Sequence, residues 1–369
     1  MSLVRCSRCV MPSTRPDVPF TDGVCQACIN YANRPKIDWD ARQRELCDLL
    51  ERGRNSSGYD VIVPSSAGKD SHFQALQMIA LGARPLLVTA TTCMLTKIGR
   101  MNIDNLKRYA TTLEISPNAR VRASLNRFGL ETVGDVSHPE HMAIFTTPFR
   151  IAASLGIPLI FFGENPQSQY GGPQGTEEAR QMTMRWVSEF GGLLGLRAAD
   201  CAGYDKITMH DMRDYMMPSA EDIRKVGVEA HFLGQYRPWD SHENARVAKE
   251  AGMIQVLPCS ANWWHHENLD SALTSLHDFC LYLKYGYARA ATQLSVDIRA
   301  GLITREFAMD IVKQRDGLFP DVYMGVTLDD MLKHIGMTKA KLLNTLERFT
   351  SWELFDGEAV DGRPILKEE

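Results

Sequence analysis

The first residues whose type and spacing suggest chemistry are four cysteines near the N-terminus. Cys6 and Cys9 form one CxxC motif, Cys25 and Cys28 form a second, and fifteen residues separate the two pairs. This spacing is typical of structural zinc sites, because two CxxC turns aim four thiolates at one point and leave no coordination position for water. The intervening loop is poor in apolar residues, so metal binding would supply the free energy that folds it. A redox pair of motifs or an iron–sulfur cluster is the alternative.

A second candidate site is the segment at 66–71, which reads SAGKDS. It follows an apolar run at 59–64 that predicts a buried strand, and it precedes a helix with Phe73, Leu76 and Ala80 on one face. A strand, a loop of small residues and a helix form the usual architecture of a phosphate site. The segment is not a Walker A loop, which needs G-x-x-x-x-G-K-[ST]. An ordinary strand-to-helix turn with a serine cap is the alternative.

Other strands and helices must position these segments. Further strands are expected at 85–90, 130–134, 158–163 and 231–234, with helices at 39–52, 97–110 and 241–251. Strands that alternate with helices predict an α/β fold with a parallel sheet and right-handed crossovers. From about residue 268 onward the pattern is almost wholly helical, so the sequence predicts a C-terminal helical region.

The segment at 66–71 closely resembles the SGGxDS PP-loop of the ATP pyrophosphatases. The resemblance implies a fold like that of the adenine nucleotide alpha-hydrolases, and it implies that the whole loop binds ATP: Ser66, Ala67, Gly68, Lys69, Asp70 and Ser71. Backbone N–H groups would approach the phosphate oxygens, Lys69 would supply charge and Asp70 would hold Mg²⁺. Ala67 departs from the family's usual glycine, and a positive φ there would cost about 1 kcal/mol.

The likeness continues over nearly the whole chain. The motifs CxxCVMPxTRPxxxFxxGVCxxC, PxSxGKDSH, GENPQxxYGG, YRPWD and LKYGYARA occur in this order. Together they resemble the N-acetyl sugar amidotransferases of bacterial surface-polysaccharide biosynthesis, which are taken to convert a sugar acetamido group into an acetamidino group. The resemblance implies a zinc knuckle at 1–37, a PP-loop ATP pyrophosphatase domain at 38–262 and a C-terminal helical region at 263–369.

The strand end at 163–165 is expected to face the same sheet edge as the SAGKDS loop. Gly163 would lie against the nucleotide. Glu164 would accept a proton from incoming ammonia or orient a sugar hydroxyl, and Asn165 would bind the substrate or nucleotide. Capping of the next turn is the alternative for Glu164 and Asn165.

Three more residues are candidates for substrate binding. Tyr170 lies in a glycine-rich loop that fits a substrate. Lys284 and Arg289 flank the sequence Tyr-Gly-Tyr and would hold the carboxylate or phosphates of a nucleotide-activated sugar. The alternative for both is that they are solvated surface cations, as lone cations on helices more often are.

The implied chemistry begins at the acetamido oxygen, which attacks the α-phosphorus of ATP and gives an O-adenylyl imidate. Ammonia then displaces AMP, so the enzyme would be an AMP- and pyrophosphate-forming C–N ligase. Lys69, backbone amides and Mg²⁺ would meet the charge on the α-phosphate. The chain shows no glutaminase signature, so ammonia is expected from a separate glutaminase partner.

Composition bears on the alternatives. The chain has 41 Lys and Arg against 45 Asp and Glu, a net charge of -4, and no densely basic stretch. This argues against nucleic acid as a partner, and so against the chief rival, a tRNA-thiolating PP-loop enzyme. A nucleotide-binding, non-catalytic subunit is the second rival. No apolar run of about 18 residues suits a membrane span and the N-terminus lacks the apolar core of a signal peptide, so the protein is expected to be cytoplasmic.

Overall fold

The computed structural model describes residues 3–54, 58–359 and 362–367. A five-stranded parallel sheet with the order β5-β4-β3-β6-β7 lies at its centre. The strands are β3 (Val61–Pro64), β4 (Pro85–Ala90), β5 (Thr112–Ile115), β6 (Leu159–Phe162) and β7 (Glu229–Phe232). The chain proceeds outward from β3 to β5 on one side, and then crosses to β6 and β7 on the other. The order therefore reverses between β3 and β6, and such a switch point opens a crevice at the carboxyl ends of the strands.

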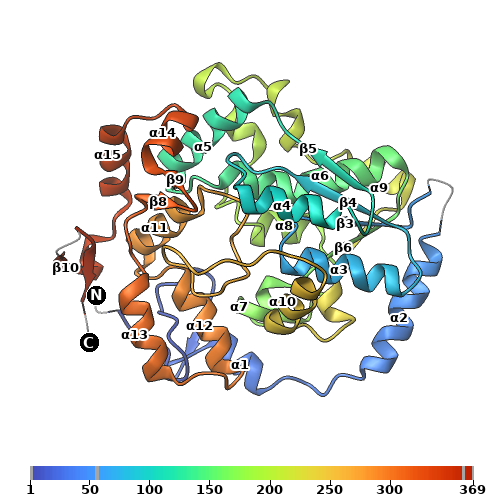
Figure 1. The fold of residues 1–369 in the computed structure, drawn as a ribbon, viewed down its shortest axis with the longest axis horizontal. Helices are drawn as coiled ribbons and strands as arrows, with labels where there is room; N and C mark the ends of the chain where they lie inside the picture. Colours follow the sequence, from blue (N-terminus) through green and yellow to red (C-terminus); the bar gives the residue numbers. More distant parts are fainter. Residues whose placement is uncertain (1–2, 55–57, 360–361, 368–369) are drawn as a thin grey trace.

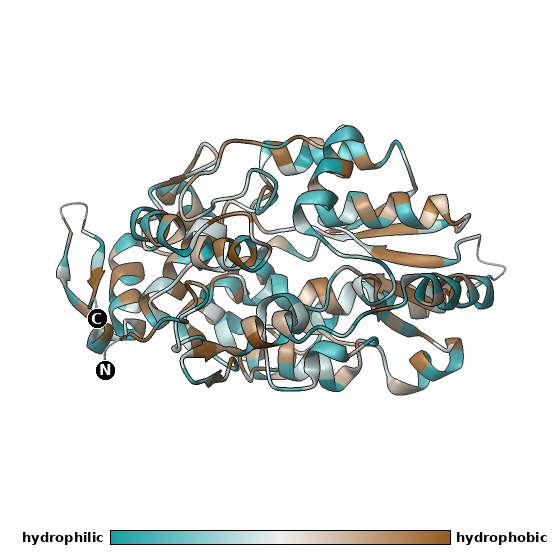
Figure 2. Ribbon diagram, turned by 90° about the horizontal axis from the view of Figure 1, so that it is seen from below, coloured by the Kyte–Doolittle hydropathy of each residue, from teal (hydrophilic) through white to brown (hydrophobic). Residues whose placement is uncertain are grey.

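Alternating residues of β3 enter two different hydrophobic cores, because successive side chains of a strand point to opposite faces. Val61 and Val63 pack with α2 (Trp39–Arg52), α3 (Lys69–Ala80) and α4 (Lys97–Leu106). On the other face the core is formed with α6 (His138–Leu155) and α8 (Met184–Phe190), and it includes Ile62 and Ile160, which are paired across β3 and β6. Figure 2 shows these strands as apolar ribbons between helices that are polar on their outer sides.

The expected strand at 130–134 is wrong. These residues end a helix, α5 (Ala119–Val133), and the third strand of the sheet is β5. The side chain of Asn118 accepts hydrogen bonds from the first turn of α5, and Gly134 with φ of 64° ends it. Other expected elements shift at their ends. The helix from 97 stops at 106, and the last strand of the sheet covers 229–232.

The remaining elements before residue 268 are short. They are α7 (Pro166–Tyr170), α9 (Ala220–Val226), α10 (Ser241–Glu250) and the 3₁₀ turns Thr176–Glu178, Ala198–Cys201, Tyr204–Lys206, Asp211–Tyr215 and Leu233–Gln235. The described residues of the C-terminal part form five helices and one 3₁₀ turn. They also form two antiparallel hairpins, which the helical pattern did not predict. These elements are α11 (Thr274–Tyr285), α12 (Arg289–Arg299), α13 (Arg305–Arg315), β8 (Val322–Tyr323), β9 (Val326–Thr327), α14 (Leu328–Ile335), α15 (Lys339–Phe349), the turn Trp352–Leu354, β10 (Phe355–Glu358) and β11 (Pro364–Leu366).

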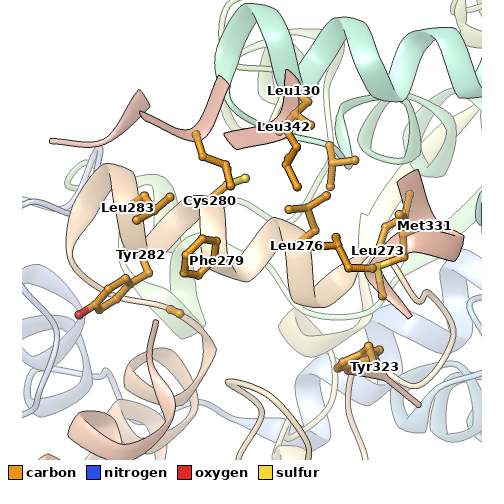
Figure 3. Close-up of a cluster of buried hydrophobic side chains, with 14 of the residues drawn as sticks. Leu130, Leu273, Leu276, Phe279, Cys280, Tyr282, Leu283, Tyr323, Met331 and Leu342 are labelled. Carbon is orange, nitrogen blue, oxygen red and sulfur yellow. The ribbon is translucent and has the colours of Figure 1, made fainter. Parts of the chain in front are cut away.

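Helix α11 joins the C-terminal part to the rest of the molecule. Its Leu276 and Phe279 belong to one buried cluster that also contains Leu130 of α5, Met331 of α14 and Leu342 of α15. Figure 3 shows side chains from these helices converging on α11. The C-terminal helices therefore share a hydrophobic core with a helix of the α/β part, while the expected domain boundaries stay predictions.

The N-terminal segment consists of a small hairpin, β1 (Phe20–Thr21) and β2 (Val24–Cys25), followed by α1 (Gln26–Ala32). It lies beside α12 and α13 (Figure 1), and its four cysteines share a buried cluster with residues of both helices. Among the described residues, no helix has the length and apolar character that crossing a bilayer requires.

Candidate functional site

The SAGKDS loop and Glu164 lie together at the switch point of the sheet. The loop follows β3, Glu164 follows β6, and these two strands are neighbours. Both segments line a cavity of about 310 Å³, here named the central cavity. Its walls include most of the loop and residues from distant segments: Ser66, Ala67, Gly68, Lys69, Asp70, Glu164, Tyr170, His266, Glu267 and Arg289.

The SAGKDS loop is shaped by hydrogen bonds to serine hydroxyls and by one residue with a left-handed backbone conformation. The backbone N–H of Ser66 donates to Oγ of Ser71 at 3.1 Å, and the N–H of Ala67 donates to Oγ of Ser65 at 3.1 Å. Ala67 has φ of 59° and its methyl group is buried. An L-residue in this region costs about 1–2 kcal/mol, so the chain adopts at Ala67 the conformation that glycine would adopt without strain.

Lys69 is the buried cation of the central cavity. Its Nζ donates to Oδ2 of Asp70 at 2.8 Å and to Oε1 of Glu267 at 2.6 Å. Burial lowers the pKa of Lys69, but the two carboxylates raise it by more, so the pKa lies well above its usual value. Lys69 therefore stays protonated in the cavity.

Neutral amides hold the two carboxylates in place. Asn244 of α10 donates to the free oxygen of Asp70 at 2.9 Å, and Gln293 of α12 donates to the free oxygen of Glu267 at 2.9 Å. Burial raises the pKa of Glu267, but Lys69 lowers it by more, to about 2. Side chains of α10 and α12 thus hold the two carboxylates, and the carboxylates hold Nζ of Lys69 in the central cavity.

Two other groups in the central cavity have shifted pKa values. Burial, together with the nearby charge of Asp70, raises the pKa of Glu164 to about 7. Burial and the charge of Glu267 raise the pKa of Tyr170 well above its usual value. Glu164 can therefore gain or lose a proton near neutral pH, whereas Tyr170 stays protonated and can donate a hydrogen bond.

Arg289 is the first residue of α12, and it lines the central cavity. Its Nη2 donates to Oδ1 of Asp278 at 2.8 Å, and the Asp278 side chain is almost fully buried. This pair fixes the guanidinium at the cavity wall. Arg289 is consequently the cation that the C-terminal part contributes to the central cavity.

The structure does not bring the other candidate residues to the central cavity. Asn165 is buried, where its Oδ1 accepts from the N–H of Gln167 and its Nδ2 donates to the carbonyl of Thr176, so it caps α7. Gly163 lies so close to Gln74 and Trp239 that a Cβ would be 3.0 Å from each. This close packing explains the glycine without a ligand.

Lys284 lines a different cavity, where its Nζ donates to the carbonyl of Val133 at 2.7 Å. The two cations that flank the Tyr-Gly-Tyr sequence therefore serve two separate cavities.

The sequence did not single out Glu267 or His266 for this site. His266 is 7% exposed, and its Nε2 has no hydrogen-bond partner among the described residues. Burial, together with the charge of Lys69, lowers the pKa of His266 to about 3, so the ring is neutral. A signal was nevertheless present in the sequence. Glu267 directly follows two tryptophans and two histidines, which is an unusual setting for a charged residue.

The four N-terminal cysteines form a second site. All four are buried, and their sulfur atoms lie within 4.8 Å of one another. The sulfurs of Cys9 and Cys25 are 3.6 Å apart, close to the ~3.8 Å that a tetrahedron with 2.3 Å zinc–sulfur bonds requires. The N–H groups of Arg8 and Cys25 also point to the sulfur of Cys6, at 3.4 and 3.3 Å. The cluster could therefore bind a metal ion such as zinc.

This cysteine cluster also supports the wall of the central cavity. The carbonyls of Cys6 and Cys9 accept hydrogen bonds from Arg305 of α13. On the other side, Ala27 of α1 lies so close to Gly171 that a Cβ there would be 3.0 Å from the Ala27 methyl group. Gly171 directly follows Tyr170, so the knuckle helps to place the tyrosine.

Comparison with known protein families gives a match in the C-terminal part of the chain. No curated protein matches the chain. Residues 261–363 match the family described as LPS biosynthesis protein WbpG-like, C-terminal domain. Glu267 and Arg289 of the central cavity belong to this segment. The matched domain indicates a protein family of lipopolysaccharide biosynthesis.

Proposed function

We propose that the protein is an ATP-dependent amidotransferase that converts the N-acetyl group of an activated sugar into an acetamidino group for lipopolysaccharide or a related surface glycan. The observation that carries the proposal is the composition of the central cavity. A PP-loop-like sequence with a buried, protonated Lys69 meets Glu164 at the switch point, and Glu267 and Arg289 of the lipopolysaccharide-type domain complete the wall.

The first step is adenylylation of the acetamido oxygen. This oxygen attacks the α-phosphorus of ATP, the bond from that phosphorus to the bridging oxygen breaks, and pyrophosphate leaves. Lys69 offsets the negative charge that develops on the phosphate. The N–H groups in the first turn of α3 have no partner within the helix, so they can donate hydrogen bonds to the same phosphate. The imidate nitrogen passes its proton to the leaving pyrophosphate, so an O-adenylyl imidate remains.

The carboxylates of the cavity suit a magnesium ion. Asp70 is close enough to Glu164 to raise its pKa, and two adjacent carboxylates are the oxygen ligands that Mg²⁺ prefers. Asp70 would hold the ion, which when bound neutralises negative charge on the phosphates.

The second step replaces AMP by ammonia. Ammonia adds to the imidate carbon, its excess proton passes to Glu164, and the bond from carbon to the AMP oxygen breaks. The pKa of about 7 suits Glu164 to this exchange. Tyr170 and Arg289 line the same cavity and can donate hydrogen bonds to the sugar.

The test measures AMP and pyrophosphate formed from ATP, Mg²⁺, ammonium chloride and UDP- or CMP-linked acetamido sugars. Asp70→Asn should reduce AMP formation at least about 100-fold while it keeps the shape of the side chain. Lys69→Ala should abolish AMP formation too, but it leaves Glu267 buried without its cation and should lower the free energy of unfolding by about 3 kcal/mol.

Thermal melting separates the loss of chemistry from the loss of fold in both variants. Wild-type turnover in Asp70→Asn would remove the loop from the mechanism. Thiolated nucleosides produced from tRNA would favour a tRNA-thiolating enzyme instead. ATP binding without AMP formation on any sugar would favour a non-catalytic subunit.

A further inference from the structure

A second cavity, of about 220 Å³, lies where the end of α11 meets the junction of α5 and α6. We call it the second cavity. Its polar and charged lining residues include Arg15, Asp135, His141, His277, Lys284 and Tyr287. The mechanism above uses none of them.

One carboxylate orients both histidines of the second cavity. Asp135 is buried, and its Oδ1 lies 2.7 Å from Nδ1 of His277 while its Oδ2 lies 3.3 Å from Nδ1 of His141. Nδ1 of His277 is hydrogen-bonded to this carboxylate, whereas Nδ1 of His141 lies at ion-pair distance from it without a hydrogen bond. Burial lowers the pKa of His141, but Asp135 raises it by more. A single carboxylate thus contacts both imidazoles and favours the charged form of His141.

Two further cations line the cavity. In the described part of the chain, neither Lys284 nor Arg15 has a carboxylate within ion-pair distance. Lys284 uses one of its three donors on the carbonyl of Val133. Burial lowers the pKa of Lys284, which a bound anion would reverse. The positive groups of the cavity therefore outnumber its one carboxylate.

The second cavity adjoins the central cavity. The guanidinium of Arg15 lies 5.8 Å from the centre of the Tyr170 ring, and Tyr170 lines the central cavity. Tyr287 lines the second cavity, and Arg289, two residues later, lines the central one. Residues that line the two cavities are therefore neighbours.

We infer that the second cavity binds the phosphate of the activated sugar while its acetamido group reaches the SAGKDS loop. This inference rests on the proposed function, and it assigns the two cations of the Tyr-Gly-Tyr segment to different parts of one substrate. Lys284, Arg15 and the two histidines hold the phosphate, and Arg289 faces the sugar. Charge-assisted hydrogen bonds to phosphate are stronger than neutral ones, so the second cavity supplies much of the substrate affinity.

The test is calorimetric titration of the whole protein with UDP and with CMP, with the central cavity saturated by the non-hydrolysable analogue α,β-methylene-ATP. One of the two nucleotides should bind. His277→Gln keeps an N–H for Asp135 but cannot become charged, and Arg15→Gln removes a cation. Each should weaken that binding at least about tenfold and raise the KM for the sugar, without a change in affinity for the ATP analogue.

Two controls complete the design. Asp70→Asn should lose AMP formation but retain the binding of UDP or CMP, and Arg185→Gln, which removes an exposed cation on α8, should change neither. The inference is overturned if neither nucleotide binds the wild-type protein, or if binding is the same in His277→Gln and Arg15→Gln. If binding depends on His277 and Arg15 but no sugar yields AMP, the phosphate site stands and the proposed function fails.

Discussion

Glu164 shows how the cavity tunes a single group. Burial and the charge of Asp70 raise its pKa from 4.5 to about 7. Between these two values the folded protein keeps a proton that the unfolded chain releases. Stability contributed by this proton is therefore complete below pH 4.5 and is lost as the pH rises to about 7. Ionisation of the buried Glu164 therefore lowers the stability of the fold, but it provides a proton acceptor near neutral pH.

The pH dependence of amidine formation should reveal this group. Only the carboxylate form of Glu164 accepts the proton from ammonia, so kcat/KM should rise about tenfold per pH unit below pH 7 and level off above it. Glu164→Gln should remove that rise. Ammonia has its own titration, so the useful quantity is the ratio of kcat/KM between wild type and variant. A ratio that is constant from about pH 5.5 to 8 would exclude Glu164 as the proton acceptor.

Local sequence could predict only some residues of the site. Lys69 and Asp70 lie in a loop whose composition and flanking elements suggest a phosphate site. Glu267 has no such local pattern, because its role comes from an ion pair with Lys69 across 198 residues. Asn165 was expected to bind substrate or nucleotide, with capping of the next turn as the alternative, and its side chain caps α7.

Elements were predictable where burial produces a simple pattern. β3, β4 and β6 are short apolar runs because both faces of the sheet are covered. β5 is an edge strand whose residues are all half-buried, and its Glu114 pairs with Arg100, so it shows no apolar run. The strand expected at 130–134 was wrong because these five residues are too few to show a helical period. The period appears only over the longer stretch from Val121 to Leu130.

The knuckle is the element whose metal can be tested alone. Cys6→Ser should lower the zinc content and reduce the free energy of unfolding by about 3–5 kcal/mol, because the cluster lies in a core shared with α12 and α13. Cys47→Ser is the matched control, since Cys47 is exposed on α2. Elemental analysis and thermal melting measure both effects. Full metal content together with lost activity in Cys6→Ser would contradict a structural role.

At the scale of the whole molecule, the source of ammonia can be addressed. A glutaminase of the cysteine type needs a reactive thiolate. Burial raises the pKa of Cys93 and of Cys201 to about 12 each, which disfavours that form. The four knuckle cysteines form the possible metal site. Burial raises the pKa values of Cys259 and Cys280 as well. A separate glutaminase subunit as the ammonia supply stays a prediction.

The purified protein should therefore form amidine with ammonium chloride and form none with glutamine. Addition of a glutaminase subunit should restore the reaction with glutamine. The measurement is product formation at equal total nitrogen for the two donors. Glutamine-dependent turnover by the purified chain alone would show that the glutaminase lies in this chain after all.

The central cavity also has a consequence for the growing polypeptide. Its walls run from Ser66 to Arg289, so three quarters of the chain must leave the ribosome before the walls can close. The SAGKDS loop is made early, but Lys69 gains its ion pair with Glu267 only after residue 267 is translated. The central cavity is thus completed late in synthesis, when the segment that matches the lipopolysaccharide family packs against α5.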